Sequence, residues 1–275
     1  MNVRITALAE NTAGPGVLAE WGWSVLVEAD GVRILMDTGQ SSVAVHNAGL
    51  LRLDLRQIDK LVLSHGHYDH TGGLEDVLRR TGEREIIAHP DIWDEKYAVY
   101  GASRRYIGIP AARPQLESLG ARFRLSKEPV WITDRIVTSG EIPMTTAYEK
   151  TDAHLCVHRG DSMEPDPFAD DLAIAVKTEK GLIVILGCAH RGMVNTLRHF
   201  QKLTGEERVH CVIGGTHLIA ASAEWLAQAA ADLRKIGVGK LGVSHCTGFS
   251  AASWLAAEFP GTFFQFNAGS VVSLP

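Results

Sequence analysis

The chain has 275 residues, of which 27 are Lys or Arg and 32 are Asp or Glu, so its formal net charge is −5 at pH 7. This mildly acidic balance disfavours a general nucleic-acid-binding or membrane-binding surface, and no apolar run approaches the roughly 20 residues of a membrane-spanning helix. The length suits one large domain or two small ones. We expect a single domain over residues 1–275, because no linker-like or low-complexity stretch divides the chain.

The four cysteines are scattered and form no C-x-x-C pair: Cys156, Cys188, Cys211 and Cys246. Sparse, unpaired cysteines are typical of free thiols in a reducing compartment. Residues 1–5 lead directly into a strand-like run, without the apolar segment of a signal peptide. Together these features predict a cytoplasmic location.

In the first half of the chain, two strand-like runs at 24–28 and 32–36 flank Asp30-Gly31, which is a hairpin signal. We then expect a helix and its approach over 41–57, a buried strand over 60–64, a helix near 73–80 and a strand over 85–88. Residues 91–125 are less regular and rich in aromatic residues. We interpret this stretch as an insertion that forms a lid over the site.

The second half alternates between strands and helices. Strands are expected at 129–133, 136–139, 172–177, 182–186, 209–213, 240–244 and 263–266, and helices at 221–236 and 250–259. Two groups of strands with helices collected around them predict an α/β fold built as a four-layer αββα sandwich.

Three imidazoles and a carboxylate fall within six residues, directly after the buried strand: His65, His67, Asp69 and His70. Neutral imidazole and carboxylate are ligands that suit Zn²⁺, Mn²⁺ or Fe. Four donors in one short loop would crowd a single ion. The motif therefore predicts two divalent ions, with His65 and His67 facing one and Asp69 and His70 facing the other.

The motif resembles the metallo-β-lactamase superfamily, and the wider pattern is similar to one subfamily of it. That subfamily is named after 7,8-dihydropterin-6-yl-methyl-4-(β-D-ribofuranosyl)aminobenzene 5′-phosphate synthase. The resemblance covers nearly the whole chain and is carried by residues 37–39 (DTG), 64–74 (SHGHYDHTGGL), 186–190 (LGCAH), 214–218 (GGTHL) and 245–248 (HCTG). It implies the αββα fold and a metal site at the strand ends.

Three further histidines stand where an apolar run gives way to small residues: His190, His217 and His245. Strand ends are rigid anchors for metal ligands. The superfamily's last motif is a strand-end His that binds the second ion, which implies this role for His245, and we assign His190 as the other terminal ligand. His217 is left with two roles, metal contact or substrate contact, and we favour substrate contact.

The remaining ligand positions stay open. The superfamily commonly has a His before one strand and a bridging Asp after the next, whereas this chain offers Asp171 before one strand and Cys188 after the next. Either residue, or a water alone, could bridge the ions. Asp37 could cap a turn or support the metal loop from outside, and the resemblance implies support.

These residues predict a metallohydrolase in which two ions, most simply Zn, turn a water into hydroxide near neutral pH. Asp69 would ligate one ion and accept a hydrogen bond from the attacking water. Arg104 and Arg105 could bind a phosphate bidentately, with Tyr106 beside them, or could belong to an ordinary surface loop. The expected substrate is a small anionic phosphate ester or pyrophosphate.

Other functions compete with this one. The subfamily's name implies a synthase that condenses a dihydropterin pyrophosphate with an aminobenzene ribotide. A di-iron redox protein would need a partner domain and an acid-rich iron shell that the chain lacks. A non-catalytic sensor conflicts with the complete ligand set, and a nuclease conflicts with the net charge. The substrate, the native metal and any assembly into homo-oligomers stay open.

Overall fold

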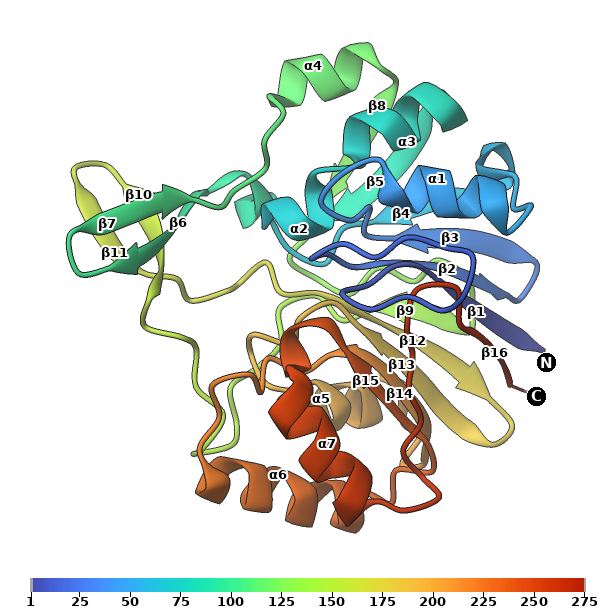
Figure 1. The fold of residues 1–275 in the computed structure, drawn as a ribbon, viewed down its shortest axis with the longest axis vertical. Helices are drawn as coiled ribbons and strands as arrows, with labels where there is room; N and C mark the ends of the chain where they lie inside the picture. Colours follow the sequence, from blue (N-terminus) through green and yellow to red (C-terminus); the bar gives the residue numbers. More distant parts are fainter. Residues whose placement is uncertain (1, 275) are drawn as a thin grey trace.

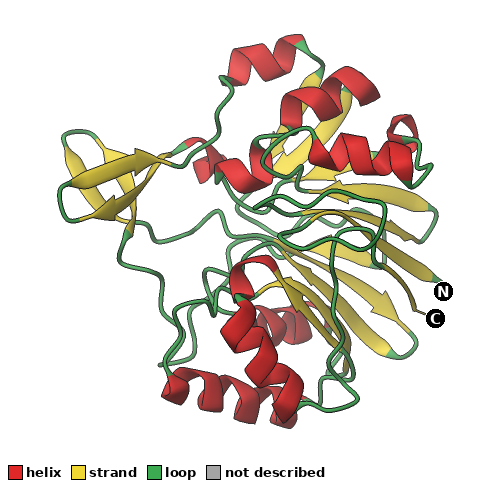
Figure 2. Ribbon diagram, viewed as in Figure 1, coloured by secondary structure: helices red, strands yellow, loops and turns green. Residues whose placement is uncertain are grey.

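Two large β-sheets face each other, and helices cover the outer face of each (Figures 1 and 2). The computed structural model describes residues 2–274. In sheet order, the seven-stranded sheet consists of β16 (Val271–Leu274), β1 (Val3–Ala9), β2 (Ser24–Ala29), β3 (Val32–Met36), β4 (Lys60–Val62), β5 (Arg84–Ala88) and β8 (Ala121–Leu125). The five-stranded sheet consists of β15 (Leu241–Ser244), β14 (Val209–Gly215), β13 (Gly181–Leu186), β12 (Ala173–Thr178) and β9 (Ile136–Thr138).

Three layers of buried apolar side chains hold these elements together. One lies between the two sheets and includes Ile34, Val62, Ile185 and Ile213. A second joins the seven-stranded sheet to α1 (Val43–Leu50), α3 (Leu74–Thr81) and α4 (Arg113–Ser118). A third joins the five-stranded sheet to α5 (Met193–Thr204), α6 (Ala223–Ile236) and α7 (Phe249–Glu258). The predicted αββα sandwich is therefore confirmed.

Parallel pairing brings the chemically active loops to one edge of the sandwich. β3, β4 and β5 are parallel neighbours in one sheet, and β13, β14 and β15 are parallel neighbours in the other. Because parallel strands end on the same side, the loops that follow their carboxyl ends converge there. The short helix α2 (Tyr68–Thr71) follows β4 at this edge, and the 3₁₀ turn His245–Thr247 follows β15.

A third, smaller sheet projects from the body (Figure 1). We call it the projecting sheet; in sheet order it consists of β11 (Ser162–Pro165), β10 (Leu155–Arg159), β6 (Glu95–Tyr100) and β7 (Ser103–Tyr106). Two segments far apart in the sequence thus form one sheet. Residues 113–125 of the expected insertion instead belong to the body, because β8 pairs with β5 and α4 packs on the seven-stranded sheet.

Two expected strands are wrong. Residues 129–133 and 263–266 contribute only isolated bridges, Trp131 to Val137 and Phe263 to Leu241. In the first segment the Thr133 hydroxyl accepts hydrogen bonds from the backbone N–H groups of Arg135 and Ile136, which closes a turn in place of a ladder. Within residues 2–274, no helix is long and apolar enough to cross a membrane.

Candidate metal centre

The loop that carries the ligand motif is fixed by close backbone packing. A side chain at Gly66 would collide with the backbone oxygen of Ile92, and one at Gly73 would collide with that of Thr38. The Gly66 N–H donates to Asp170 at 2.9 Å, and the Asp37 carboxylate accepts from the Ser64 N–H at 2.7 Å. The loop therefore presents its four polar side chains from a rigid backbone.

His65, His67 and His190 form one group of potential ligands, which we call cluster A. His65 Nε2 and His190 Nε2 lie 3.2 Å apart. Burial, reinforced by the neighbouring imidazoles, holds the pKa of His65 and of His190 well below the ordinary value, and burial does the same for His67. All three rings are therefore neutral at pH 7 and offer lone pairs to a cation.

Asp69, His70 and His245 form a second group, cluster B. His70 Nε2 lies 3.2 Å from His245 Nε2, and His245 Nε2 lies 3.4 Å from Asp69 Oδ2. Burial alone would raise the pKa of Asp69, but its hydrogen bond with His245 and the charges of the surrounding imidazoles hold it well below the usual range. The carboxylate is therefore ionised.

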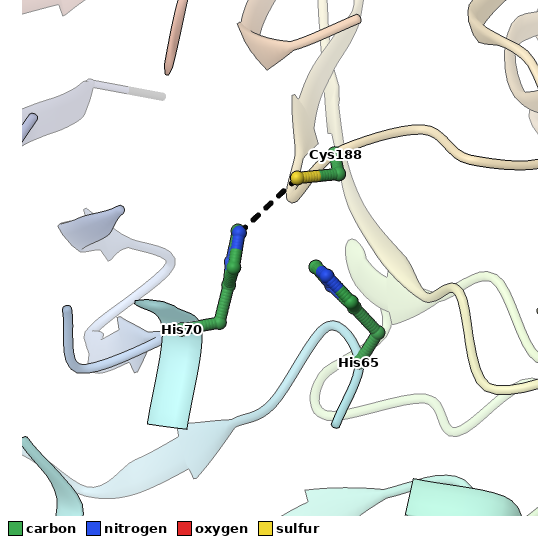
Figure 3. Close-up of side chains that lie close together, drawn as sticks. All are labelled: His65, His70 and Cys188. Carbon is green, nitrogen blue, oxygen red and sulfur yellow. Dashed lines mark hydrogen bonds between the residues drawn. The ribbon is translucent and has the colours of Figure 1, made fainter. Parts of the chain in front are cut away.

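Cys188 lies between the two clusters, on the loop after β13. Its Sγ is 3.1 Å from His70 Nε2, and it forms a further potential ligand group with His65 and His70 (Figure 3). Asp171, the other candidate for a bridging ligand, belongs to none of the potential ligand groups of the described residues. Its Oδ2 accepts from the Arg191 N–H at 2.9 Å. Of these two candidates, Cys188 is therefore the one whose side chain lies within reach of residues of both clusters.

The donor set fits divalent ions. Two imidazole nitrogens on one tetrahedral Zn²⁺, each about 2.1 Å from it, lie about 3.4 Å apart, close to the 3.2 Å within each cluster. His67 Nε2 and His190 Nδ1 are buried without a hydrogen-bond partner among the described residues. Unpartnered buried nitrogens are costly, so a bound ion would relieve part of this cost.

Comparison with known proteins identifies relatives of this chain. Residues 22–158 match the metallo-β-lactamase superfamily. The 7,8-dihydropterin-6-methyl-4-(β-D-ribofuranosyl)-aminobenzene-5′-phosphate synthase of Methanocaldococcus jannaschii is 34% identical, over 98% of this chain and 96% of that protein. An uncharacterized protein of the same organism is 33% identical, over 98% of this chain and 100% of its own. A solved metal-dependent hydrolase of the β-lactamase superfamily is 28% identical, covers 98% of both chains and has a TM-score of 0.87.

This chain belongs to the metallo-β-lactamase superfamily. Its ligand motif follows β4 at the edge of the sandwich. The chain departs from the common pattern in having no histidine before β12. His190, two residues after Cys188, contributes the third imidazole of cluster A instead.

Asp37 supports the metal loop from outside the clusters. Its Oδ2 lies 2.7 Å from His70 Nδ1 and accepts from the Ser64 hydroxyl at 2.6 Å. Burial alone would lower the pKa of His70, but the Asp37 charge raises it to about 9. Since Nδ1 faces Asp37, Nε2 is the nitrogen that faces cluster B, and a bound ion would take the place of its proton.

His217 stands beside cluster A without joining it. Its ring centroid lies 4.2 Å from that of His190, and its Nδ1 is buried without a partner in the part of the chain that the structure describes. It also forms a potential ligand group with Cys188 and His190. Both roles expected for His217, metal contact and substrate contact, are compatible with this position.

The residues expected to bind phosphate lie on the projecting sheet. Arg104, Arg105 and Tyr106 are all exposed on β7. The Arg105 guanidinium lies 5.5 Å from the centroid of the Tyr68 ring, which belongs to the metal loop. Tyr106 donates from its hydroxyl to the Ile109 carbonyl at 3.1 Å. These side chains are therefore near the loop but belong to neither cluster.

The sequence did not indicate the buried lysine, carboxylates and aromatic ring that lie behind cluster A. Lys96 of β6 donates to Asp166 at 2.6 Å and to Asp170 at 2.9 Å, and it is 1% exposed. The Phe168 ring stacks on His190 with centroids 3.9 Å apart, and Lys96 lies 5.3 Å from the Phe168 centroid. A lone lysine in an irregular stretch gives no sequence signal of burial, because its partners lie about 70 residues away.

Proposed function

We propose that this protein is a metal-dependent hydrolase that acts on a phosphate ester or pyrophosphate of a small molecule. The observation that carries the proposal is the pair of clusters flanking Cys188, with ligand atoms within 4.8 Å of one another in each group. Such spacing suits two ions that share one reaction centre. When bound, two divalent ions, most simply Zn²⁺, would lower the pKa of a water and neutralise charge on a transferred phosphoryl group.

Asp69 is the catalytic residue in this proposal. Its carboxylate is ionised, and the residue is 7% exposed, so the carboxylate is nearly dehydrated. One oxygen would hold the cluster B ion, and the other would accept a hydrogen bond from the attacking water and orient it. The hydrogen bond that the Trp23 N–H donates to the Asp69 carbonyl, at 3.1 Å, helps to fix the residue.

His217 and the arginines of β7 would hold the substrate. The unpartnered Nδ1 of His217 could donate to a phosphoryl oxygen beside cluster A. Arg104 and Arg105 would add charge-assisted hydrogen bonds from the projecting sheet. Cys188 would bridge the ions through its thiolate, since a coordinating thiol is deprotonated.

A condensing synthase is the second candidate. One observation favours it: the 34% identity, over almost the full length of both chains, to the synthase of Methanocaldococcus jannaschii. The same residues would then stabilise a leaving pyrophosphate while a carbon or nitrogen nucleophile takes the place of water. The hydrolase is preferred because Asp69 is ionised and placed to orient a water.

Metal analysis and paired assays test the proposal. Protein purified without chelators should hold about two transition-metal ions per chain, and it should hydrolyse members of a panel of phosphomonoesters, phosphodiesters, pyrophosphates and lactones. A single tightly held ion, with no second site on titration, would overturn the dinuclear mechanism. Condensation of the pterin pyrophosphate and the ribotide, without hydrolysis of any panel member, would favour the synthase.

The cysteine content and the net charge of the chain suggest a cellular location and a class of partner. We propose the cytoplasm as the compartment, on the basis of four scattered free cysteines, and a small anionic molecule as the partner, not nucleic acid or a membrane. Fractionation of native cells would test the first point, and mobility shift with DNA and RNA the second.

A further inference from the structure

Two of the four free cysteines lie close together at the edge of the candidate metal centre. Cys188 follows β13 and Cys246 follows β15, and the two are 58 residues apart in the chain. Their Sγ atoms and a ring nitrogen of His245 all lie within 4.8 Å of one another. Cys156 on β10 and Cys211 on β14 belong to no comparable group of the described residues. The pair is therefore distinct from the other two thiols.

A glycine at the end of the intervening strand makes this approach possible. β14 lies between β13 and β15 in the five-stranded sheet and ends at Gly215. A Cβ atom at position 215 would lie 2.6 Å from Cys246 Sγ and 3.2 Å from Cys188 Cα. A larger residue there would therefore crowd the space between the two cysteines.

The contacts of each sulfur fix where it lies. The Cys246 thiol donates to the Cys188 carbonyl at 3.5 Å and accepts from the His217 N–H at 3.2 Å. Cys188 Sγ lies 3.1 Å from His70 Nε2 (Figure 3). A disulfide bond of about 2.05 Å needs a further approach of the two sulfurs, which rotation about the Cα–Cβ bonds between staggered rotamers supplies. The two loops thus already hold the thiols near bonding distance.

The burial of the pair selects the kind of oxidant that can reach it. Cys188 is 3% exposed and Cys246 is 4% exposed, so a bulky oxidant is excluded. Hydrogen peroxide is little larger than water and is the natural candidate. Cys156, at 7% exposed, is at least as accessible, but it lies on the projecting sheet, apart from the sheet that carries the other three cysteines. Cys156 is therefore a matched control, an accessible thiol outside the pair.

We propose that Cys188 and Cys246 form a reversible oxidation site, in which hydrogen peroxide joins the two thiols in a disulfide bond that lowers the affinity of the centre for metal. The proposal goes beyond the proposed function, because the disulfide depends on the two thiols and not on the reaction that is catalysed. Only the thiolate form of cysteine binds metal. Once Cys188 is part of a disulfide, the sulfur that lies between the two clusters is no longer available as a charged ligand.

The oxidation proceeds in two balanced steps. In the first, one thiol gives up its proton and its sulfur attacks a peroxide oxygen. The O–O bond breaks, the S–O bond of a sulfenic acid forms, and the departing hydroxide takes up the proton as water. In the second, the sulfur of the other thiol attacks the sulfenic sulfur, so that the S–O bond breaks, the S–S bond forms and a second water leaves. The two thiols thus supply the two electrons that reduce one peroxide to two waters.

Metal and peroxide compete for the same sulfur. A thiolate whose lone pairs are bound to ions is a poor nucleophile, so metal-free protein should be oxidised first. The disulfide would then prevent reloading of the centre until a dithiol reduces it. In a reducing compartment, disulfides are usually transient and respond to oxidants, which fits a site that is oxidised and then restored.

Peroxide treatment of the full-length, metal-free protein tests the disulfide itself. After denaturation and alkylation with N-ethylmaleimide, mass spectrometry counts the remaining thiols and maps the linked peptides. We expect the loss of two hydrogen atoms, a linked peptide pair that contains Cys188 and Cys246, and full recovery with dithiothreitol. Cys156→Ser should form the same disulfide as wild type, whereas Cys246→Ser should leave a sulfenic acid on Cys188 that dimedone traps. The peptide map of wild type decides the point even if Cys246→Ser does not fold.

Metal titration tests the consequence of the disulfide. Competition of Zn²⁺ with a chelator compares oxidised and reduced wild type, so the measurement needs no substrate. We expect the oxidised protein to bind at least one ion roughly tenfold or more weakly, and dithiothreitol to restore the affinity. Protein loaded with Zn²⁺ before treatment should form the disulfide more slowly than metal-free protein. If no ester is hydrolysed but both measurements follow this expectation, the hydrolase proposal fails and the oxidation site stands.

Three results overturn the oxidation site. The first is that peroxide leaves all four thiols of the metal-free protein reactive with N-ethylmaleimide. The second is that peroxide adds oxygen to Cys188 or Cys246, or links other cysteines, without forming the peptide pair. The third is that the disulfide forms but oxidised and reduced protein bind both ions equally tightly, so that the bond has no effect on the centre.

Discussion

Clusters A and B contain similar ligands but are supported by different parts of the molecule. In cluster B, the outer nitrogen of each ring has a partner in the body: Asp37 lies 2.7 Å from His70 Nδ1, and Asn11 Oδ1 lies 3.0 Å from His245 Nδ1. In cluster A, His190 Nδ1 has no such partner among the described residues. Cluster B is therefore preorganised by hydrogen bonds of the sandwich, and cluster A is less so.

Cluster A depends instead on packing and on the projecting sheet. Lys96 is held by two buried carboxylates, and one of them, Asp170, also accepts from the Gly66 N–H between His65 and His67. Phe168, beneath the His190 ring, lies next to the same lysine. Loss of the buried Lys96 ammonium group should therefore weaken binding of the cluster A ion much more than binding of the cluster B ion.

The largest expected effect concerns the carboxylate of cluster B. Asp69→Asn removes the carboxylate of the two clusters, together with the acceptor for the hydrogen bond of the attacking water. We expect the protein to fold normally and to lose about 10³-fold or more in kcat. Steady-state kinetics on the best substrate of the panel, together with elemental analysis, measures this loss.

The matched control is Asp76→Asn, the same change at an exposed residue of α3. It should have wild-type kinetics, because Asp76 lies outside both clusters. Wild-type turnover by a metal-loaded Asp69→Asn protein would show that the chemistry does not depend on cluster B as proposed.

The next effect tests the dependence of cluster A on the projecting sheet. Lys96→Met leaves Asp166 and Asp170 buried without their cation, which costs about 3–5 kcal/mol when a buried pair is broken. We expect a lower free energy of unfolding and selective loss of one ion, with cluster B still occupied. Denaturant unfolding and metal titration, with Co²⁺ absorption as the signal for each site, measure the two effects.

Two control variants test whether the effect of Lys96→Met is specific to the buried charge. Lys60→Met breaks the partly exposed ion pair between Lys60 of β4 and Glu85 of β5. It should cost no more than about 1 kcal/mol and keep both ions. Lys96→Arg keeps the charge and should restore part of the lost metal affinity. Equal weakening of both ions in Lys96→Met would contradict the assignment of this lysine to cluster A.

Alanine variants of the histidines at strand ends show how much each one contributes to metal affinity. His190→Ala should weaken one ion and His245→Ala the other, each by more than the roughly 10–100-fold that loss of a supporting partner costs. His217→Ala should keep both ions and mainly raise KM. Competition with a chelator gives the order. If His217→Ala lost metal most readily while His190→Ala retained it, the roles of these two residues would be reversed.

The ligand residues of the two clusters could be predicted from the sequence. His65, His67, Asp69 and His70 are close in the chain, so their proximity in space follows from local geometry. His190 and His245 follow apolar strand runs, and parallel pairing brings such strand ends to one edge. The layering of the fold could be predicted from the two groups of strand-like runs with helical segments around them, although α5 (Met193–Thr204) was not expected.

The support of cluster A could not be predicted in this way. Lys96 and Asp166 are separated by 70 residues and meet because β6 pairs with β10, across two segments without clear periodicity. Nothing local distinguishes Lys96 from a surface lysine, since its burial is set entirely by the partner segment. Asn11, the partner of His245 in cluster B, is likewise separated from it by 234 residues.

The two clusters should also differ in how they make the free energy of unfolding of the metal-free protein depend on pH. His65, His67 and His190 are neutral when folded, because their pKa values lie well below 6.5. In the unfolded chain they bind protons below about pH 6.5. The unfolded state then holds more protons, so the free energy of unfolding should fall as pH decreases from 6.5, by up to about 1.4 kcal/mol per pH unit and proton. Asp171, with its pKa raised by burial to about 7, opposes this slope with one proton.

His70 of cluster B gives the opposite slope at higher pH. Its pKa of about 9 in the folded protein exceeds the unfolded value, so its stabilisation is complete below about pH 6.5 and is lost as pH rises towards 9. Denaturant unfolding of metal-free protein between pH 5 and 9 should show both slopes. Asp37→Asn should flatten the alkaline slope alone, and equal flattening of both slopes would contradict the division into two clusters.

The smallest expected effect tests whether the projecting sheet also binds substrate. Arg104 and Arg105 are adjacent and exposed, and the second lies over the ring of Tyr68 in the metal loop. A charge-assisted hydrogen bond to phosphate contributes about 1.5–3 kcal/mol, so replacing both by Ala should reduce kcat/KM about tenfold or more. The reduction should be confined to phosphorylated substrates, with metal content unchanged.

Arg79 and Arg80 provide the matched control, because they are also adjacent and exposed, on α3. Their replacement by Ala changes the net charge equally, so a general electrostatic effect on substrate encounter would appear in both double variants and decrease with added salt. A local phosphate contact would appear only in the β7 variant and persist at high salt. Equal activity of the Arg104/Arg105 variant on phosphorylated and neutral substrates would restrict the projecting sheet to its structural role behind cluster A.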